Sequence, residues 1–288
     1  MVGMNGFDVK DGFYYMLAPI EDMTDSSFRT ICWNRGKGAD LTFTELSRLE
    51  SLARRNACTL EKIKLYDETP TMIQLVGQKE MSLKRLLSGF VPNKGFRGFN
   101  LNLGCPAPDF VGQGIGCAMV KRISKTRKLV DIIKDHDYGV SIKMRLGLNR
   151  FEKEKKVYLN LINSVDADFF IVHARHGKET YVDKADWSVF PGCVKTGKPI
   201  IANGDIRTKD DAQKMKDFGC KGVMIGRAAT VNPLIFAELK SLPLPQIGGL
   251  KAEYERLLKE RNVAFKYPKN IFKHLGKSEA DGDYGDMG

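Results

Sequence analysis

The sequence contains few of the residues that hold structural metals or disulfide frameworks. Its 6 cysteines include no C-x-x-C pair and are scattered along the chain, which argues against a structural zinc site and a compact disulfide scaffold. Among the 4 histidines, only His173 and His176 have a spacing typical of metal ligands. No carboxylate cluster accompanies them in the sequence, so we predict no metal site.

Long apolar segments are also missing. No window approaches the roughly 18 consecutive apolar residues of a membrane-spanning helix. Residues 1–11 contain Gly, Asn and Asp where a secretory signal needs an unbroken apolar stretch. We therefore expect a soluble protein of the reducing cytoplasm, with no membrane partner.

Basic side chains are in clear excess. The 288 residues include 46 Lys and Arg against 35 Asp and Glu, a net charge of +11. Such a surplus favours a polyanionic partner, and nucleic acid is the first candidate. A hydrophobic content of 42% is too high for a disordered chain and is enough for one large domain or two small ones.

Eight short apolar runs recur along the chain, each followed by a stretch with helical spacing. Near-continuous apolar runs are typical of parallel strands buried on both faces. Eight such units favour a (β/α)8 TIM barrel, which usually has about 250 residues. The rival, a doubly wound sheet, normally carries a Gly-rich turn after its first strand, and residues 17–21 contain none. The predicted strands are 13–17, 41–44, 71–75, 98–102, 140–144, 169–172, 199–202 and 222–225.

The amino-acid composition of the sequence changes after residue 239. We expect the barrel to occupy residues 1–239 and a Pro- and Gly-rich linker to occupy 240–249. A short basic helical extension over 250–277 and a disordered tail over 278–288 follow. Residues 240–277 contain 9 basic side chains against 3 acidic ones, so we expect them to contact nucleic acid. We also expect the barrel to stay folded when residues 250–288 are removed.

Two helices in the barrel have recognisable start signals. Ser124 can cap a helix that runs to Lys134, and Thr208 can cap a helix whose first turn is acidic.

Polar residues gather at the carboxyl ends of the predicted strands, where barrels of this type carry their functional groups. The last two strands end in 202–206 and 225–229, segments that contain Gly204 and Gly226. Backbone N–H groups at these positions often bind a phosphate. Taken alone, the two segments are equally compatible with ordinary turns that use glycine for its backbone freedom.

The most specific motif is N-x-G-C-P at Asn102–Pro106, followed by a Gly-rich loop to residue 118. It occurs together with Ala-Pro at 18–19, Gln74-x-x-Gly77, K-x-R-L-G at 143–147, His173-x-Arg175, Asn203-Gly-Asp205 and Gly226-Arg227. In this combination and order, residues 14–236 closely resemble the tRNA-dihydrouridine synthase family.

The resemblance implies an enzyme that uses FMN, reduced by NADPH, to saturate the C5–C6 bond of particular uridines in tRNA. Addition of hydride to uracil C6 leaves a carbanion at C5, and Cys105 would protonate it. A thiol with an ordinary pKa of about 8.5 is mostly protonated at neutral pH, as this role requires. Lys143 would be the second catalytic residue, beside the flavin edge that becomes negative on reduction.

The resemblance also implies which residues bind the cofactor and the substrate. Asn102, Arg175 and Tyr181 would hold the flipped uracil and a nearby phosphate. The implied cofactor-binding residues are Ala18, Pro19, Ile20, Gln74, Lys143, His173, Asn203, Gly204, Asp205, Gly226 and Arg227.

Some positions depart from the family pattern. Ile20 stands where a Met is usual, and Cys117 replaces a small residue, which raises the possibility of a second redox-sensitive thiol near the site. The C-terminal helical part is shorter than is usual for the family. We expect a monomer, and we assign the remaining cysteines to packing: Cys32, Cys58, Cys193 and Cys220.

Two other functions stay open. An FMN barrel acting on a free pyrimidine, such as a dihydroorotate dehydrogenase, would share Lys and Asn residues facing the flavin, although the basic C-terminal segment argues against it. A catalytically inert RNA-binding protein on the same scaffold is the other alternative.

Overall fold

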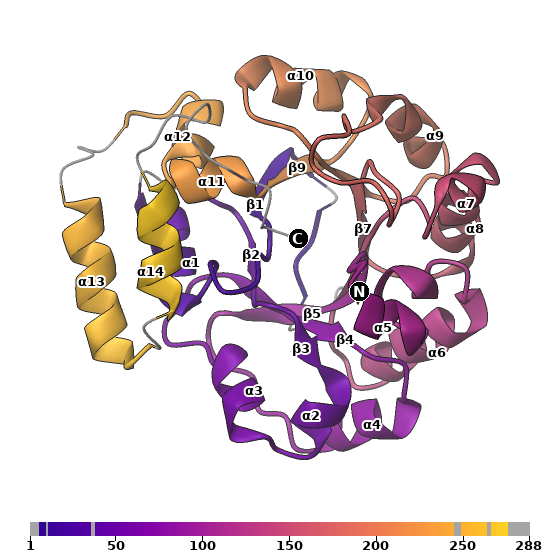
Figure 1. Ribbon diagram of the computed structural model, residues 1–288, viewed down its shortest axis with the longest axis horizontal. Helices are drawn as coiled ribbons and strands as arrows, with labels where there is room; N and C mark the ends of the chain where they lie inside the picture. The colour runs from indigo at the N-terminus through magenta and orange to yellow at the C-terminus, as the bar shows by residue number, and fades with distance from the viewer. Residues whose placement is uncertain (1–5, 10, 36–37, 245–248, 264–265, 276–288) are drawn as a thin grey trace.

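The computed structural model describes residues 6–9, 11–35, 38–244, 249–263 and 266–275. The predicted tail, 278–288, and part of the predicted linker lie outside this range. Within it the chain forms a barrel of parallel strands surrounded by helices (Figure 1). The predicted fold class is therefore confirmed.

Nine strands form the barrel, one at each predicted apolar run and one short additional strand. The additional strand, β3, pairs with the end of β4, because the chain breaks at residues 44–46 and then returns to the sheet. The strands are β1 (Tyr14–Leu17), β2 (Thr42–Phe43), β3 (Ser47–Arg48), β4 (Thr71–Val76), β5 (Phe96–Leu103), β6 (Val140–Met144), β7 (Phe169–His173), β8 (Ile200–Asn203) and β9 (Gly222–Ile225).

The order of the strands is β1-β9-β8-β7-β6-β5-β4-β2, and every pairing is parallel. A bridge between Met16 and Leu41 joins the first and last strands of this order, so the sheet closes on itself. Closure brings the carboxyl ends of all the strands to one end of the barrel.

Helices cover the outside of the barrel. They are α1 (Ser26–Asn34), α2 (Leu49–Ala53), α3 (Ala57–Lys62), α4 (Glu80–Ser88), α5 (Pro108–Gly112), α6 (Ile123–Lys134), α7 (Arg150–Glu154), α8 (Val157–Ser164), α9 (Phe190–Val194), α10 (Lys209–Asp217), α11 (Arg227–Val231), α12 (Ile235–Leu239), α13 (Leu250–Arg261) and α14 (Lys266–His274). None of the described helices is long and apolar enough to cross a membrane.

The core has two parts. A small cluster fills the barrel interior and includes Met16, Phe43, Phe169 and Met224, none more than 1% exposed. A larger cluster lies between the sheet and the helices. Strands β1, β4, β7, β8 and β9 contribute to both clusters and are therefore buried on both faces, which is why they appear in the sequence as unbroken apolar runs.

One predicted helix cap is confirmed and one is wrong. Thr208 caps α10 in a reciprocal arrangement with Asp211, in which each side chain accepts a hydrogen bond from the other's backbone N–H. Helix α6 instead begins at Ile123, one residue before Ser124. Its N-cap position is Arg122, whose side chain makes no capping hydrogen bond.

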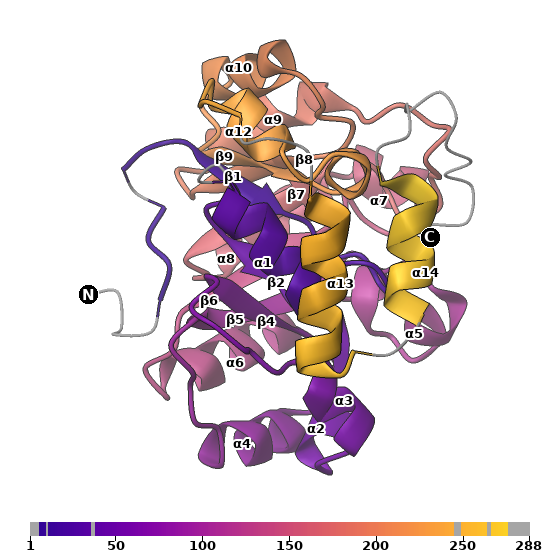
Figure 2. The same cartoon turned by 90° about the vertical axis from the view of Figure 1, so that its left-hand side faces the viewer.

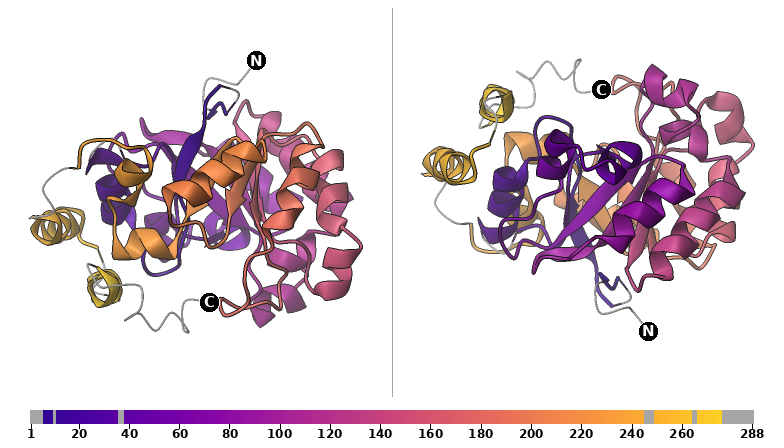
Figure 3. Two further views of the ribbon diagram at one scale, coloured as in Figure 1. Left: turned by 90° about the horizontal axis from the view of Figure 1, so that it is seen from above. Right: turned by 90° about the horizontal axis from the view of Figure 1, so that it is seen from below.

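Helices α13 and α14 lie side by side against one flank of the barrel (Figures 2 and 3). Leu257 and Leu258 of α13 and Ile271 of α14 belong to the main core. The Tyr254 hydroxyl donates to Asp25 Oδ1 at 3.1 Å, and the Tyr267 hydroxyl donates to Glu45 Oε2 at 2.5 Å. Loss of residues 250–288 would expose these core side chains, so the expectation that the barrel stays folded without them stays a prediction, and this packing argues against it.

The cysteines are all free, but their environments differ from the prediction in two cases. Cys32, Cys193 and Cys220 are buried, as expected for packing residues. Cys58 is exposed on α3, so its assignment to packing is wrong. Cys117 is fully buried, and its thiol donates to the Gly147 carbonyl at 3.1 Å.

Candidate active site

A cleft opens at the carboxyl ends of the strands, where the sequence predicts the cofactor. It is bounded by residues that follow β1, β8 and β9, together with side chains from β6 and β7. Ten of the predicted cofactor-binding residues and the predicted substrate residue Tyr181 line it. These ten are Ala18, Pro19, Ile20, Lys143, His173, Asn203, Gly204, Asp205, Gly226 and Arg227. Ile206, Ile225 and Ala228 lie in the two turns predicted at the ends of the last strands, whereas sequence reasoning missed Arg207 and Met224 on the same surface.

Asp205 organises the end of the cleft at β8 and β9. Its Oδ2 accepts from Arg175 Nη2 at 2.6 Å and its Oδ1 accepts from Arg227 Nη2 at 2.9 Å. Burial alone would raise the pKa of Asp205, but the hydrogen bonds from Arg175 and from the Ala185 N–H outweigh it and lower that pKa. One carboxylate thus holds two guanidinium groups at this end of the cleft.

Arg175 is only 1% exposed, and all of its donors point into protein. Besides Asp205, it donates to the Asp183 carbonyl oxygen. Its Nη1 also donates to His173 Nε2 at 3.1 Å. This geometry favours a supporting role for Arg175 over the predicted contact with substrate. Asp205 likewise supports the arginines rather than facing an anion.

His173 is neutral in this environment. Because a guanidinium can only donate, His173 Nε2 accepts from Arg175, and the ring proton lies on Nδ1. Burial, followed by the charges of Lys143 and three arginines, lowers the pKa of His173 well below its usual value. The neutral ring stacks on Tyr181, with centroids 6.4 Å apart. Tyr181 in turn lies under the Arg227 guanidinium, 4.0 Å from it.

Lys143 projects into the cleft from β6. Burial, with a smaller contribution from the charge of Arg145, lowers the pKa of Lys143 to about 8. Among the residues that the structure describes, none forms a hydrogen bond or ion pair with its ammonium group. A half-buried cation without a partner is costly, so this position suits an anionic ligand.

Cys105 lies in the turn after β5, and Asn102 holds that turn in place. The Asn102 side-chain oxygen accepts from the backbone N–H groups of Gly104 and Cys105, at 3.0 and 2.9 Å. Its amide nitrogen donates to Gln74 Oε1 at 2.9 Å. Asn102 was predicted to hold uracil, and these contacts give it a positioning role for Cys105 as well.

Burial raises the pKa of the Cys105 thiol, although the Ala107 N–H and the charges of Arg145 and Lys143 oppose the effect. The thiol therefore stays protonated at neutral pH, as an acid catalyst requires. Burial also raises the pKa of Cys117 to about 12. A buried, protonated thiol is unreactive toward oxidants, so the expectation of a second redox-sensitive cysteine is wrong.

Gln74 lies beneath the site rather than on the surface of the cleft. It is 1% exposed, and its side-chain nitrogen donates to Asn100 Oδ1 at 2.8 Å while its oxygen accepts from Asn102. Asn100 continues the chain of bonds to Ser141 Oγ at 2.8 Å. This buried network fixes Asn102. The sequence marks Asn100 as a polar residue near a strand end but assigns it no role, because an amide inside a strand gives no signal of its partners.

The residues fit an anionic nucleotide cofactor. Lys143 is an unmatched cation that lines the cleft, and Arg227 lines its other end. Gly226 keeps the cleft open: a Cβ there would lie 3.3 Å from the side chains of both Ala18 and Ile20. Gly204, with φ of +116°, brings the chain within contact distance of His173.

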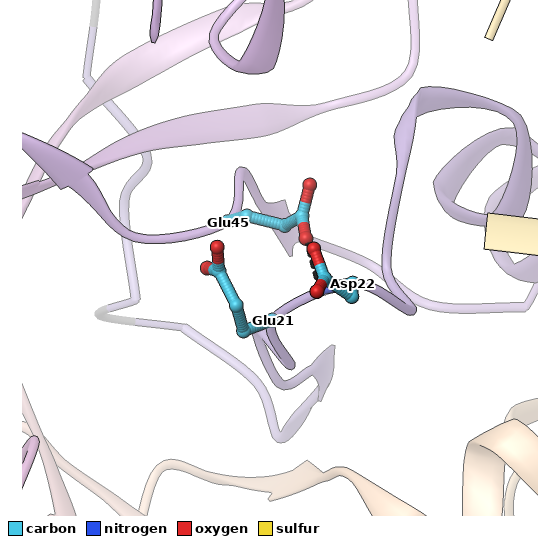
Figure 4. A group of neighbouring side chains, drawn as sticks. All are labelled: Glu21, Asp22 and Glu45. Atoms are coloured by element: carbon cyan, nitrogen blue, oxygen red, sulfur yellow. Dashed lines mark hydrogen bonds between the residues drawn. The ribbon is translucent and has the colours of Figure 1, made fainter. Parts of the chain in front are cut away.

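Three carboxylates gather near the entrance, at the loop after β1 and the end of β2: Glu21, Asp22 and Glu45 (Figure 4). Glu45 accepts a hydrogen bond from the Asp22 backbone N–H, and Lys62 pairs with Glu21. The carboxylates therefore have protein partners, and we assign this cluster a structural role in which it links the β1 loop to α14 through Tyr267.

Comparisons with known proteins place this geometry in a family. The model of the dihydrouridine synthase family matches residues 16–260. The chain belongs to the dihydrouridine synthase family. A Helicobacter pylori protein described as a "probable tRNA-dihydrouridine synthase" is 31% identical over 81% of this chain and 72% of its own length. The tRNA-dihydrouridine synthase B of Pseudomonas putida is 27% identical over 86% of this chain and 75% of its own.

Solved structures agree with the fold of this dihydrouridine synthase. Morphinone reductase superposes with a TM-score of 0.52 at 11% identity, covering 84% of this chain and 88% of its own. At this identity the likeness concerns the barrel alone. Family membership makes the chain a flavin-dependent oxidoreductase, and the cleft is where its residues fit the flavin.

Proposed function

We propose that this dihydrouridine synthase reduces the C5–C6 bond of uridines within tRNA, with FMN as its flavin and NADPH as the reductant. The observation that carries the proposal is the position of Cys105. Its protonated thiol lies in the turn after β5, near enough to Lys143 for the ammonium charge to act on the thiol pKa. Lys143 lines the cleft as an unmatched cation, which suits a flavin that becomes anionic on reduction.

When bound, the flavin supplies the hydride that adds to uracil C6. Side chains of this protein bind the cofactor and supply the proton. Lys143 stabilises negative charge at the edge of the cofactor, because it lines the cleft and has no other described partner. Arg227 and the glycine turns bind the phosphate, while Arg175 and Asp205 hold Arg227 and His173 in place.

Cys105 delivers the proton that uracil C5 needs. Asn102 fixes the backbone of Cys105 through two hydrogen bonds, so the thiol has a defined position when substrate arrives. Tyr181, half-exposed at the cleft between His173 and Arg227, is the predicted contact for an extruded base. The free cysteines agree with our placement of the protein in the reducing cytoplasm, and we propose that it acts as a monomer.

The direct test uses the purified protein, an unmodified tRNA transcript and NADPH. We expect a yellow protein that contains about one FMN per chain and adds two hydrogen atoms to individual uridines, detected by mass spectrometry of the digested tRNA. Release of FAD would contradict the cofactor assignment. Reduction of free orotate or uracil, with no effect on the transcript, would favour the small-molecule alternative.

A further inference from the structure

A second depression lies outside the barrel, between α2 and α4, well apart from helices α13 and α14 (Figure 1). We call it the α2–α4 groove. It has a volume of about 970 Å³. Fourteen described residues line it, and only three of these are apolar: Ala53, Met81 and Ile115. Small-molecule sites are usually lined mostly by apolar and aromatic side chains, so this lining is unlike theirs.

Positive charge dominates the α2–α4 groove. Five basic side chains line it against one acidic side chain, Glu50. The basic residues are Arg48, Arg54, Lys79, Lys84 and Arg85. Arg54, Lys79, Lys84 and Arg85 are exposed, and none of them forms an ion pair or side-chain hydrogen bond with another described residue. Four exposed cations that lack carboxylate partners favour a ligand carrying repeated negative charges.

The α2–α4 groove is continuous with the loop that carries Cys105. Gln113 and Ile115, at the end of that loop, line the groove. The Gln113 backbone oxygen accepts from Gln78 Nε2 at 2.8 Å, and Arg48 reaches Gln113 Oε1 at 3.2 Å. The Cys117 N–H donates to the Cys105 carbonyl at 2.8 Å. A chain leaving the active site on this side would therefore meet the groove next.

We propose that the α2–α4 groove binds the sugar-phosphate backbone of the RNA whose uridine occupies the active site. The inference rests on the proposed function for the identity of the RNA. It adds a second contact surface, on a different flank of the barrel from the C-terminal helices. Exposed arginine and lysine side chains contact phosphates without reading sequence, so the groove supplies affinity and orientation rather than the choice of base.

Binding of an unmodified tRNA transcript to the FMN-loaded protein tests the proposal. The groove variant carries Arg54→Gln, Lys84→Gln and Arg85→Gln. The control carries Lys195→Gln, Lys209→Gln and Lys216→Gln, which removes the same charge from exposed positions in and near α10, across the barrel from α2 and α4 (Figures 1 and 2). Matching net charge separates a local contact from general electrostatic attraction.

We expect the groove variant to lower the slope of log affinity against log salt concentration by about 2 to 3, since each phosphate contact contributes about 0.7–0.9. We expect the control variant to change this slope by less than the roughly 0.7–0.9 that a single phosphate contact contributes. Nuclease footprinting should show a protected backbone segment that is lost only in the groove variant. Equal slopes and equal footprints for the two variants would overturn the groove proposal.

The two proposals fail in different ways. Failure of the wild-type protein to reduce the transcript contradicts the proposed function, whereas binding and footprints are measured without turnover. The groove variant is also compared with the wild type for binding to anionic lipid vesicles. Normal binding of the variant to tRNA together with weaker binding to the vesicles would show that the groove binds a membrane surface, and the RNA proposal would be wrong.

Discussion

The Cys105 thiol is expected to act only on the substrate. We predict that Cys105→Ala lowers dihydrouridine formation by about 10²–10⁴, the usual value of a positioned acid, because the C5 carbanion loses its proton source. NADPH oxidation by an artificial electron acceptor and FMN content should stay near wild type. Since burial raises the pKa of Cys105, deprotonation of this thiol should not limit the rate of the FMN-saturated wild type until the pH exceeds the ordinary pKa of a thiol. Equal losses in both assays would make Cys105 a structural residue.

Lys143 gives the cleft a pH dependence. Its pKa is lowered to about 8, so the ammonium group of the cofactor-free protein loses its proton as the pH rises through that value. Because an anionic ligand prefers the charged form, we predict that the affinity for FMN falls between pH 7 and pH 9, with the protein taking up a proton on binding above pH 8. Calorimetry in buffers of different ionisation enthalpy measures that uptake. Lys143→Met should abolish it and lower the flavin reduction potential.

At the scale of elements, the turn that carries Cys105 depends on a close backbone approach. Gly116 has φ of +59°, and a Cβ there would lie 2.5 Å from the Cys105 carbonyl oxygen. We predict that Gly116→Ala displaces Cys105 and costs about 1–2 kcal/mol of stability or more, because an L-residue is strained in this region. Gly112→Ala is the matched control, since nothing lies within 4 Å of its Cβ. Dihydrouridine formation should drop in the first variant alone, with FMN retained in both.

Helix α14 is joined to the barrel through a carboxyl group that resists ionisation. Burial raises the pKa of Glu45 from 4.5 to about 7. Because its folded-state pKa lies above the unfolded value, the contribution of Glu45 to the free energy of unfolding is fully present below pH 4.5. That contribution is lost as the pH rises to about 7. We predict that Glu45→Gln removes this loss, which is at most about 3 kcal/mol. Urea unfolding at pH 5 and pH 8 measures the difference, and exposed Glu68→Gln should behave as wild type.

At the scale of the whole molecule, the net charge of +11 is expected to act through particular surfaces. Much of the basic C-terminal segment is used inside the protein: Arg261 pairs with Asp67, and Lys240 pairs with Asp40. Lys259, Lys269 and Lys273 remain exposed. We predict that changing these three lysines to Gln lowers the salt slope of tRNA binding by about 2 to 3 while leaving the barrel folded. A wild-type slope would show that this extension only supports the fold.

The sequence predicted the barrel and most of the cleft because both follow from regular spacing. Buried parallel strands appear as apolar runs, and the residues that end them must meet at one end of a closed sheet. The sequence could not predict which side chains bind one another within the folded protein. Arg175 was predicted to contact the substrate and Asp205 the cofactor, and only the structure shows that the two bind one another. Cys58 and Cys117 are the same residue type, and their exposure depends on packing that no local pattern encodes. The roles of Tyr254 and Tyr267 needed contacts over more than 200 residues.

The loop after β1 contributes to both the flavin cleft and the docking of helix α14. Ile20 lines the flavin cleft, while Asp22, two residues later, accepts a hydrogen bond through its backbone carbonyl from Asn270 of α14. Cofactor binding and helix docking therefore share one short piece of backbone. We expect each to favour the other because both need this backbone ordered, and by thermodynamic reciprocity the two effects are equal. Loading the protein with FMN should slow amide hydrogen exchange in α14, far along the chain from any atom that touches the cofactor, and loosening α14 should make the flavin dissociate faster.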